Sequence, residues 1–312
     1  MKRIIFLFRT VIFTITILFF ISELRGQCLD EADTLCDIVP PFTPIYTEST
    51  IGGSWRMIIS NGIPNHNIGE FGTPRVRPLA CGRRNAISEQ SYFVIIPINS
   101  GITETGAKEY DPLEPLTPFG VAINGVLFDP EAAEWTTCTP PPDSRWQKSA
   151  LNHPDMQYDV DCNNGHVQGT GAYHYHGFPF GLFKKKGGIV LDIISIAGRE
   201  TKTILLGWGF DGVPIYGPFC YTKTLKPREK GWWTPKSGWV VKTKPLIPPP
   251  YCVPPDAYLG YYDEDYEYVG GVDALDECNG HFAPTPEYPK GIYHYHITMN
   301  YPHIPRCYTE MK

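Results

Sequence analysis

The sequence predicts a mainly β protein, built as one antiparallel sandwich- or barrel-like domain with long Pro/Gly-rich loops and disulfides. Proline and glycine, with 31 and 30 residues, are spread along the whole chain and leave little room for long helices. Short apolar or alternating runs recur between them, and most of these runs end in Gly, Pro or Asn. Such runs are typical of strands.

The expected strands follow one another in chain order. They lie at residues 54–60, 92–98, 120–128, 189–196, 203–208 and 238–242. One short helix is expected at 129–134, because Pro130 would stand at its first position, where proline is favoured.

Residues 1–26 are typical of a secretory signal peptide, because Lys2 and Arg3 precede an apolar stretch that turns polar at Ser22. The uninterrupted apolar part, 11–21, is shorter than the roughly 20 residues of a membrane-spanning helix. This length favours cleavage after Gly26 over the alternative, an uncleaved anchor. We therefore expect a secreted, extracellular protein without membrane contact after cleavage.

The mature chain is acidic. The first 26 residues hold four positive side chains and one negative one, so their removal takes the formal net charge from −6 to −9. A surface of that sign argues against nucleic acid as a partner. An extracellular protein or matrix component stays open as a partner, and the oligomeric state is not predicted.

Nine cysteines follow the expected signal peptide, and disulfides are their default state in a secreted chain. The odd number leaves one thiol that is free, paired between chains or bound to a metal. The connectivity cannot be deduced from the spacing. The cysteines are Cys28, Cys36, Cys81, Cys138, Cys162, Cys220, Cys252, Cys278 and Cys307.

Composition divides the mature chain into an N-terminal arm at 27–48, which contains Cys and Pro, and one domain at 49–312. A Pro- and Tyr-rich excursion at 223–269 interrupts the domain, and Cys220 and Cys252 flank its proline-rich part. Its end, 258–269, interleaves tyrosines with carboxylates. We expect a solvated acidic loop there, with a cation site as the alternative, since the carboxylates lack the spacing of a calcium loop.

A duplicated histidine motif is the feature that carries chemistry. The string Tyr-His-Tyr-His occurs at 173–176 and again at 293–296. Cys-Asn-Asn-Gly-His precedes the first copy, and Cys-Asn-Gly-His precedes the second. The two resulting half-sites span 162–176 and 278–296. They contain six of the nine histidines, namely His166, His174, His176, His281, His294 and His296.

The spacing of these histidines suits a metal ion. On a strand, the two histidines of each string point to one face with Cα atoms about 6.5 to 7 Å apart, and the tyrosines point to the other face. The Asn-Gly turn presents the third histidine. Imidazole ligation favours a transition metal over calcium or magnesium. Copper is slightly preferred over zinc, because an oxidising secreted setting and neighbouring tyrosines suit redox work.

Residues beside the histidines are candidates for orienting them. The tyrosines are either packing residues or hydrogen-bond partners, and Asp161 and Glu277 each precede a half-site cysteine. Asp211 lies in a turn-forming Gly-Phe-Asp-Gly string, where a structural role in the turn is expected. The alternative is that its carboxylate orients a ligand histidine. The orienting candidates are Tyr173, Tyr175, Tyr293, Tyr295, Asp161, Asp211 and Glu277.

The repeated motif and several other stretches resemble the YHYH-domain family. The similar stretches are 60–66, 120–130, 211–218 and 275–281. The resemblance covers residues from about 50 to 310 and implies a secreted or exported domain. It makes His66 the best candidate for a seventh ligand or a general base, whereas its turn-like context alone favours a loop histidine with satisfied hydrogen bonds. The first half-site has one Asn more than the second, which predicts a shift of His166 relative to His281.

Three functions fit these observations. The first is a copper-dependent redox protein, and the second is a hydrolytic centre in which the ion acidifies a bound water. The third is a non-catalytic extracellular module, in which the His and Tyr strands form a hydrogen-bonded ladder and the 223–269 excursion contacts a partner. The sequence leaves open whether the protein is an enzyme and whether the two half-sites share a dinuclear site.

Overall fold

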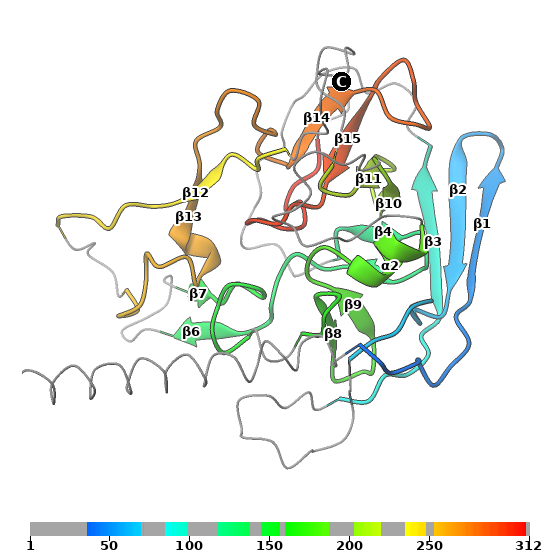
Figure 1. Cartoon of the computed structure of the whole chain (residues 1–312), viewed down its shortest axis with the longest axis horizontal. Coiled ribbons are helices and arrows are strands. Elements are labelled where there is room, and N and C mark those ends of the chain that lie inside the picture. Colours follow the sequence, from blue (N-terminus) through cyan, green and yellow to red (C-terminus); the bar gives the residue numbers. More distant parts are fainter. Residues whose placement is uncertain are drawn as a thin grey trace, which may run out of the picture.

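The computed structural model describes residues 36–69, 71, 85–98, 118–137, 145–156, 160–186, 203–219, 235–247 and 253–309. These residues form strands with little helix, so the predicted mainly β class is confirmed (Figure 1). The expected signal peptide and the expected strand at 189–196 lie outside the described residues.

The main sheet has eight strands in the order β14-β15-β11-β10-β4-β5-β9-β8. Its strands are β4 (Gly120–Ala122), β5 (Leu127–Phe128), β8 (Gly165–Val167), β9 (Tyr173–Tyr175), β10 (Leu205–Gly209), β11 (Pro214–Tyr216), β14 (Gly280–Ala283) and β15 (Ile292–His296).

This strand order is symmetric about its centre, because equivalent strands of the two halves follow one another outward from the middle of the sheet. The first half, β4, β5, β9 and β8, has the same succession as the second half, β10, β11, β15 and β14. Each half joins its inner hairpin to its outer hairpin by a parallel pair, β5 with β9 and β11 with β15. The halves meet where β4 pairs antiparallel with β10. The sheet is therefore mixed, whereas the sequence predicted antiparallel pairing.

A second, three-stranded sheet contains β1 (Tyr46–Ile51), β2 (Trp55–Ser60) and β3 (Tyr92–Pro97). Its residues Ile58 and Ile96 pack on Val121 and Trp208 in the middle of the main sheet. This packing of one sheet on another gives a sandwich-like architecture, and no closed barrel occurs among the described strands.

The opposite face of the main sheet bears the larger core. Tyr173, Tyr175, Tyr293 and Tyr295 are fully buried in it. The helix α2 (Phe180–Lys185) contributes Leu182 and Phe183 to the same core, and basic residues in its last turn complement the helix dipole. The tyrosine face of both repeats is thus an interior face.

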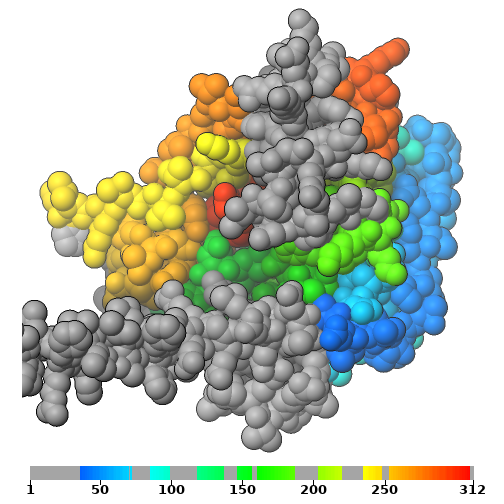
Figure 2. Space-filling view, viewed as in Figure 1, coloured from blue at the N-terminus to red at the C-terminus, as the bar shows by residue number. Residues whose placement is uncertain are grey.

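Two smaller sheets lie away from the main one. One joins β6 (Trp135–Thr137) to β7 (Arg145–Gln147), and the other joins β12 (Trp239–Val241) to β13 (Tyr266–Tyr268). Figure 2 shows the region of β12 and β13, in yellow and orange, on the side of the molecule away from the blue β1–β2 hairpin.

The prediction of a helix at 129–134 is wrong. Those residues are irregular, because the Asp129 amide donates to the Tyr175 carbonyl over 2.8 Å and so extends the sheet. The expected single strand at 120–128 is two strands, β4 and β5. They are joined by a turn with Gly125 at a φ of 83°.

The prediction of a solvated acidic loop at 258–269 is also wrong. The segment forms a 3-10 helix (Asp263–Asp265) followed by β13. Asp265 is fully buried, and its carboxylate accepts hydrogen bonds from the backbone amides of Tyr258, Gly260, Tyr261 and Tyr262. Four backbone donors offset the cost of burying this charge.

Two disulfides fix the half-sites to other segments. Cys162 is bonded to Cys36 of the N-terminal arm, and Cys278 is bonded to Cys307 near the C-terminal end. The other five cysteines lie outside the described residues. Among the helices that the structure describes, none has the length and apolar character needed to cross a membrane.

Candidate metal centres

The six histidines of the repeats form two separate triads, each on one hairpin. In the first centre His166 of β8 lies directly opposite His174 of β9, and His176 follows at the end of β9. In the second centre His281 of β14 lies directly opposite His294 of β15, which also carries His296. Within each triad the ligand nitrogens lie within 4.8 Å of one another, so each triad could hold a metal ion.

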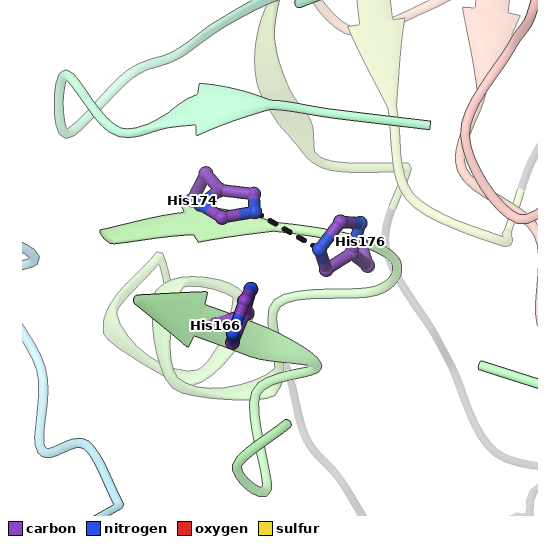
Figure 3. A group of neighbouring side chains, drawn as sticks. All are labelled: His166, His174 and His176. Atoms are coloured by element: carbon purple, nitrogen blue, oxygen red, sulfur yellow. Dashed lines mark hydrogen bonds between the residues drawn. The ribbon is translucent and has the colours of Figure 1, made fainter. Parts of the chain in front are cut away.

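The three imidazoles of the first centre turn toward one another (Figure 3). The Nε2 atoms of His174 and His176 are 2.9 Å apart. In the second centre, the Nε2 atom of His281 is 3.1 Å from that of His294 and 3.1 Å from that of His296. Two nitrogens bound to one ion at about 2.0 to 2.1 Å are separated by about 2.9 to 3.4 Å. The His174–His176 pair and both pairs of His281 have this spacing, and the remaining ligand atoms of each triad lie within 4.8 Å.

Backbone carbonyls fix which ring nitrogen carries the proton. The Nδ1–H of His174 donates to the Ala172 carbonyl over 3.2 Å, and that of His294 donates to the Ile292 carbonyl over 2.9 Å. The Nδ1–H groups of His176 and His296 donate to the carbonyls of Asp129 and Gly217. A carbonyl only accepts, so the proton resides on Nδ1 and the lone pair of Nε2 faces the centre.

Burial keeps these imidazoles neutral. It lowers the pKa of His174 to about 3, with a further effect of the neighbouring His166, and lowers the pKa of His296 to about 4. The pKa values of His176 and His294 are lowered well below the usual range, first by burial and then by the adjacent histidine. At neutral pH, each centre therefore presents Nε2 atoms that carry no proton and whose lone pairs could bind a metal ion.

The tyrosines of each repeat point away from the histidines and form hydrogen bonds inside the core. Tyr173 donates to Asp161 over 2.9 Å, and Tyr293 donates to Asp276 over 2.8 Å. Each aspartate also accepts the amide of the glycine four residues later, Gly165 or Gly280. The carboxylates thus tie each turn to its strand.

These contacts correct the alignment of the two half-sites. Asp276 holds the position equivalent to Asp161, whereas Glu277 is exposed. His166 follows Asp161 by as many residues as His281 follows Asp276, and the intervening Asn164 and Asn279 share a left-handed φ of 53° and 57°. The expected shift of His166 is therefore wrong. The cysteine, and not the histidine, has moved by one position.

The second tyrosine of each string has a partner from the inner hairpin. Tyr175 accepts a hydrogen bond from the Asn124 side chain over 2.9 Å, and Tyr295 donates to Asp211 over 2.7 Å. Burial raises the pKa of Asp211 to about 6. Asn124 and Asp211 each stand just before the glycine of an equivalent turn.

His66 lies on the tyrosine face and not with either triad. Its Nδ1–H donates to the Asn67 carbonyl over 2.7 Å, and its Nε2 accepts the Tyr175 hydroxyl over 2.6 Å. Burial lowers its pKa. Since the histidines of β9 point to the other face, the structure does not bring His66 to the first centre as a seventh ligand.

The two centres do not share an ion. Four strands separate β9 from β15 in the main sheet, which is roughly 24 Å along the sheet at the usual strand spacing. The half-sites accordingly lie at opposite ends of the sheet in Figure 1. The two triads therefore do not form a shared dinuclear site.

The small sheet β1–β3 covers the histidine face between the two centres. Leu127 is the Cα partner of His174, and Leu205 is the Cα partner of Tyr216, which in turn lies opposite His296. Both leucines pack on the core that Ile58 and Ile96 of the small sheet complete. The centres therefore occupy the two ends of one partly covered face.

Sequence reasoning missed Asn124 and Asp276, and the carbonyls that orient the imidazoles. Asp276 carries a signal in the sequence, since Asp161 and Asp276 each lie four residues before the glycine of the Asn-Gly pair. Aligning the repeats on the histidines instead of the cysteines reveals it. The orienting carbonyl of Asp129 has no sequence signal, because any residue supplies one.

Fold and site together define a mainly β protein with an internally duplicated sheet, in which each half carries one three-histidine cluster that could hold a metal ion. The family model described as YHYH protein matches residues 96–310. The chain belongs to this family. No curated protein and no solved structure matches the chain.

Proposed function

We propose that this protein is a secreted transition-metal protein that binds one ion at each of its two three-histidine centres. The observation that supports metal binding best is that unprotonated Nε2 atoms converge in each triad. His174 and His176 bring two of them to 2.9 Å, while their Nδ1–H groups are already engaged by carbonyls. Two lone pairs at that distance repel unless a cation lies between them.

A hydrogen-bonded ladder accounts for the tyrosine face but not for the histidine face. The tyrosine hydroxyls find Asp161 and Asp276 as acceptors. A hydrogen bond between two Nε2 atoms needs an additional proton, and the pKa of His174, lowered to about 3, disfavours that proton at neutral pH. A metal ion satisfies the same lone pairs without it.

Copper is the ion that we favour, with zinc as the alternative. Imidazole ligands suit both ions. Neither triad includes a carboxylate among the described residues, and the histidines of the second centre are all buried. The cost of burying an ion rises steeply with its charge, so monovalent copper fits a closed neutral triad better than a divalent ion. Bound copper would supply one-electron redox chemistry, and bound zinc would supply an acidified water.

Secretion is part of the proposal. The disulfides Cys36–Cys162 and Cys278–Cys307 support an oxidising compartment, and the apolar N-terminal stretch is typical of a signal peptide.

The test is metal analysis of the secreted protein, purified without a histidine tag. We expect one ion per centre, and the loss of one ion each from His174→Ala and His294→Ala. His153→Ala is the control, because this buried histidine packs on Tyr261 and Tyr262 outside both triads. Electron paramagnetic resonance of the oxidised protein identifies copper. A protein whose bound metal is unchanged in both triad variants would overturn the proposal.

A further inference from the structure

We infer that the two centres have diverged: the first is an open centre that exchanges its ion and takes an external ligand, and the second is a closed, structural centre. This inference rests on the proposed metal binding. Three differences between equivalent positions carry it, namely the exposure of the outer-strand histidine, its distance from its two companions and the side chain that lies over each triad.

Exposure differs at the histidine contributed by the outer strand. His166 is partly exposed, whereas its equivalent, His281, is only 4 % exposed. The other two ligands of the second centre, His294 and His296, have no exposed surface at all. Solvent therefore reaches the first triad along the β8 side, while the second triad is enclosed by protein.

In the first triad the outer-strand histidine lies farther from its two companions, although those two companions are closer together, with rings 4.5 Å apart for His174–His176 and 4.8 Å apart for His294–His296. The ring of His166 lies 5.3 Å from that of His174 and 5.8 Å from that of His176. The ring of His281 lies closer to its companions, at 4.6 Å from His294 and 5.0 Å from His296. The larger separations leave more space on the His166 side of the first centre.

A different side chain covers each centre. In the second half Tyr216 lies opposite His296, and its ring packs edge-on against His294 at 5.0 Å. In the first half Phe128 lies opposite Tyr175, so the next residue, Asp129, holds the equivalent position.

The smaller side chain leaves the first centre less covered. Asp129 folds its carboxylate back onto the Glu131 amide. Among the described residues, the rings in contact with His174 are those of its own two companions.

These differences have a chemical consequence. An ion with three protein ligands and an accessible fourth position binds water or a small donor, whereas an enclosed site keeps its coordination closed. The first centre is therefore the one that takes a small oxygen or nitrogen donor, such as water or azide. Release of the ion from the second centre requires local opening of the β14–β15 hairpin, which slows it.

Release kinetics test this without any activity assay. The full chain loaded with Zn²⁺ is desalted and mixed with excess pyridylazoresorcinol, which absorbs when it captures zinc. We expect two phases of equal amplitude that differ in rate by at least about tenfold. His166→Ala should remove the fast phase, and this variant alters only the partly exposed ligand. A single phase, or loss of the slow phase in His166→Ala, would overturn the inference.

Azide binding to the Cu²⁺-loaded protein gives a second readout. We expect a charge-transfer band in His281→Ala and its absence in His166→Ala. The opposite pattern would contradict the assignment of the open centre. Should His281→Ala fail to fold, the release phases of the unsubstituted chain and of His166→Ala still decide. If the chain binds no metal that depends on these histidines, the proposed function itself is wrong. If two ions bind but are released at equal rates, only the present inference is wrong.

Discussion

Tyr293 donates its hydroxyl to Asp276 over 2.8 Å, and this contact repeats that of Tyr173 with Asp161 at 2.9 Å. In both halves the carboxylate joins two parts of one hairpin. It accepts the tyrosine hydroxyl from β9 or β15, and it accepts the amide of Gly165 or Gly280 at the start of β8 or β14. The position of three imidazoles thus depends on a hydrogen bond made on the opposite face of the sheet.

Removing either hydroxyl should destabilise the fold. Tyr293→Phe removes the hydroxyl donor of Asp276 Oδ2, which costs about 1 to 3 kcal/mol. Tyr173→Phe should cost less, because Asp161 Oδ2 keeps the Gly69 amide as a donor. Urea unfolding followed by tryptophan fluorescence measures the loss. Tyr46→Phe is the matched control, because its hydroxyl donates to the exposed Glu48 and its loss should cost less than about 0.5 kcal/mol. Equal effects of all three changes would contradict a structural role for the buried pair.

Glycine should be required at Gly165 and Gly280. A Cβ atom at either position would meet the hydroxyl of Tyr173 or Tyr293. We expect Gly165→Ala and Gly280→Ala to lower the free energy of unfolding by about 1 to 3 kcal/mol and to reduce metal binding at the affected centre. Gly169→Ala, in the loop of the first hairpin, introduces a Cβ with no atom within 4 Å and should be tolerated. Thermal unfolding with metal analysis compares the three variants.

Part of the acid sensitivity should be traceable to His303. Burial lowers its pKa to about 4, against about 6.5 in an unfolded chain. The unfolded state binds the proton more tightly, so the stabilising contribution present above pH 6.5 is lost as the pH falls toward 4. The full effect is roughly 3 kcal/mol.

His303→Asn tests this directly. Asparagine tolerates the left-handed φ of 62° at this position and does not titrate. We expect urea unfolding of the variant to depend less on pH between 6.5 and 4 than that of the unchanged chain. Parallel pH profiles for the two proteins would contradict the expectation.

Metal removal should lower stability, since an ion that binds only the folded state stabilises it. A free ion concentration of about a hundred times the dissociation constant contributes about 2.7 kcal/mol for each site. Calorimetry with and without a chelator measures the shift in Tm. We expect His174→Ala and His294→Ala each to retain part of this shift and the double variant to retain none. A chelator effect that survives in the double variant would point to an ion held elsewhere.

The local parts of the site could be predicted from the sequence. The two-residue period of Tyr-His-Tyr-His put His174 and His176 on one face, and the Asn-Gly turns placed His166 and His281 beside them. The structure confirms both points. They depend only on strand geometry and turn preference, which a short string of residues determines.

The arrangement of the halves could not be predicted. The positions of β9 and β15 depend on pairing between segments far apart in the chain, and the sequence carries no local signal for strand order. Asp129 shows the same limit, because Pro130 favours a helix start but the Tyr175 carbonyl captures the Asp129 amide. The burial of Asp265 could not be predicted either, because it depends on four backbone amides that donate to its carboxylate.

The antiparallel pair of β4 and β10 lies at the centre of the symmetric strand order, between its two halves. Two identical subunits related by a two-fold axis would meet through such a seam, so the chain has the layout of a homodimer fused into one polypeptide. In a true homodimer every substitution appears twice. Here Asp129 changes without Tyr216, and His166 gains solvent contact without His281. The two halves of a single chain are free of that symmetry, so each can differ in its chemistry while the shared strand order keeps the fold.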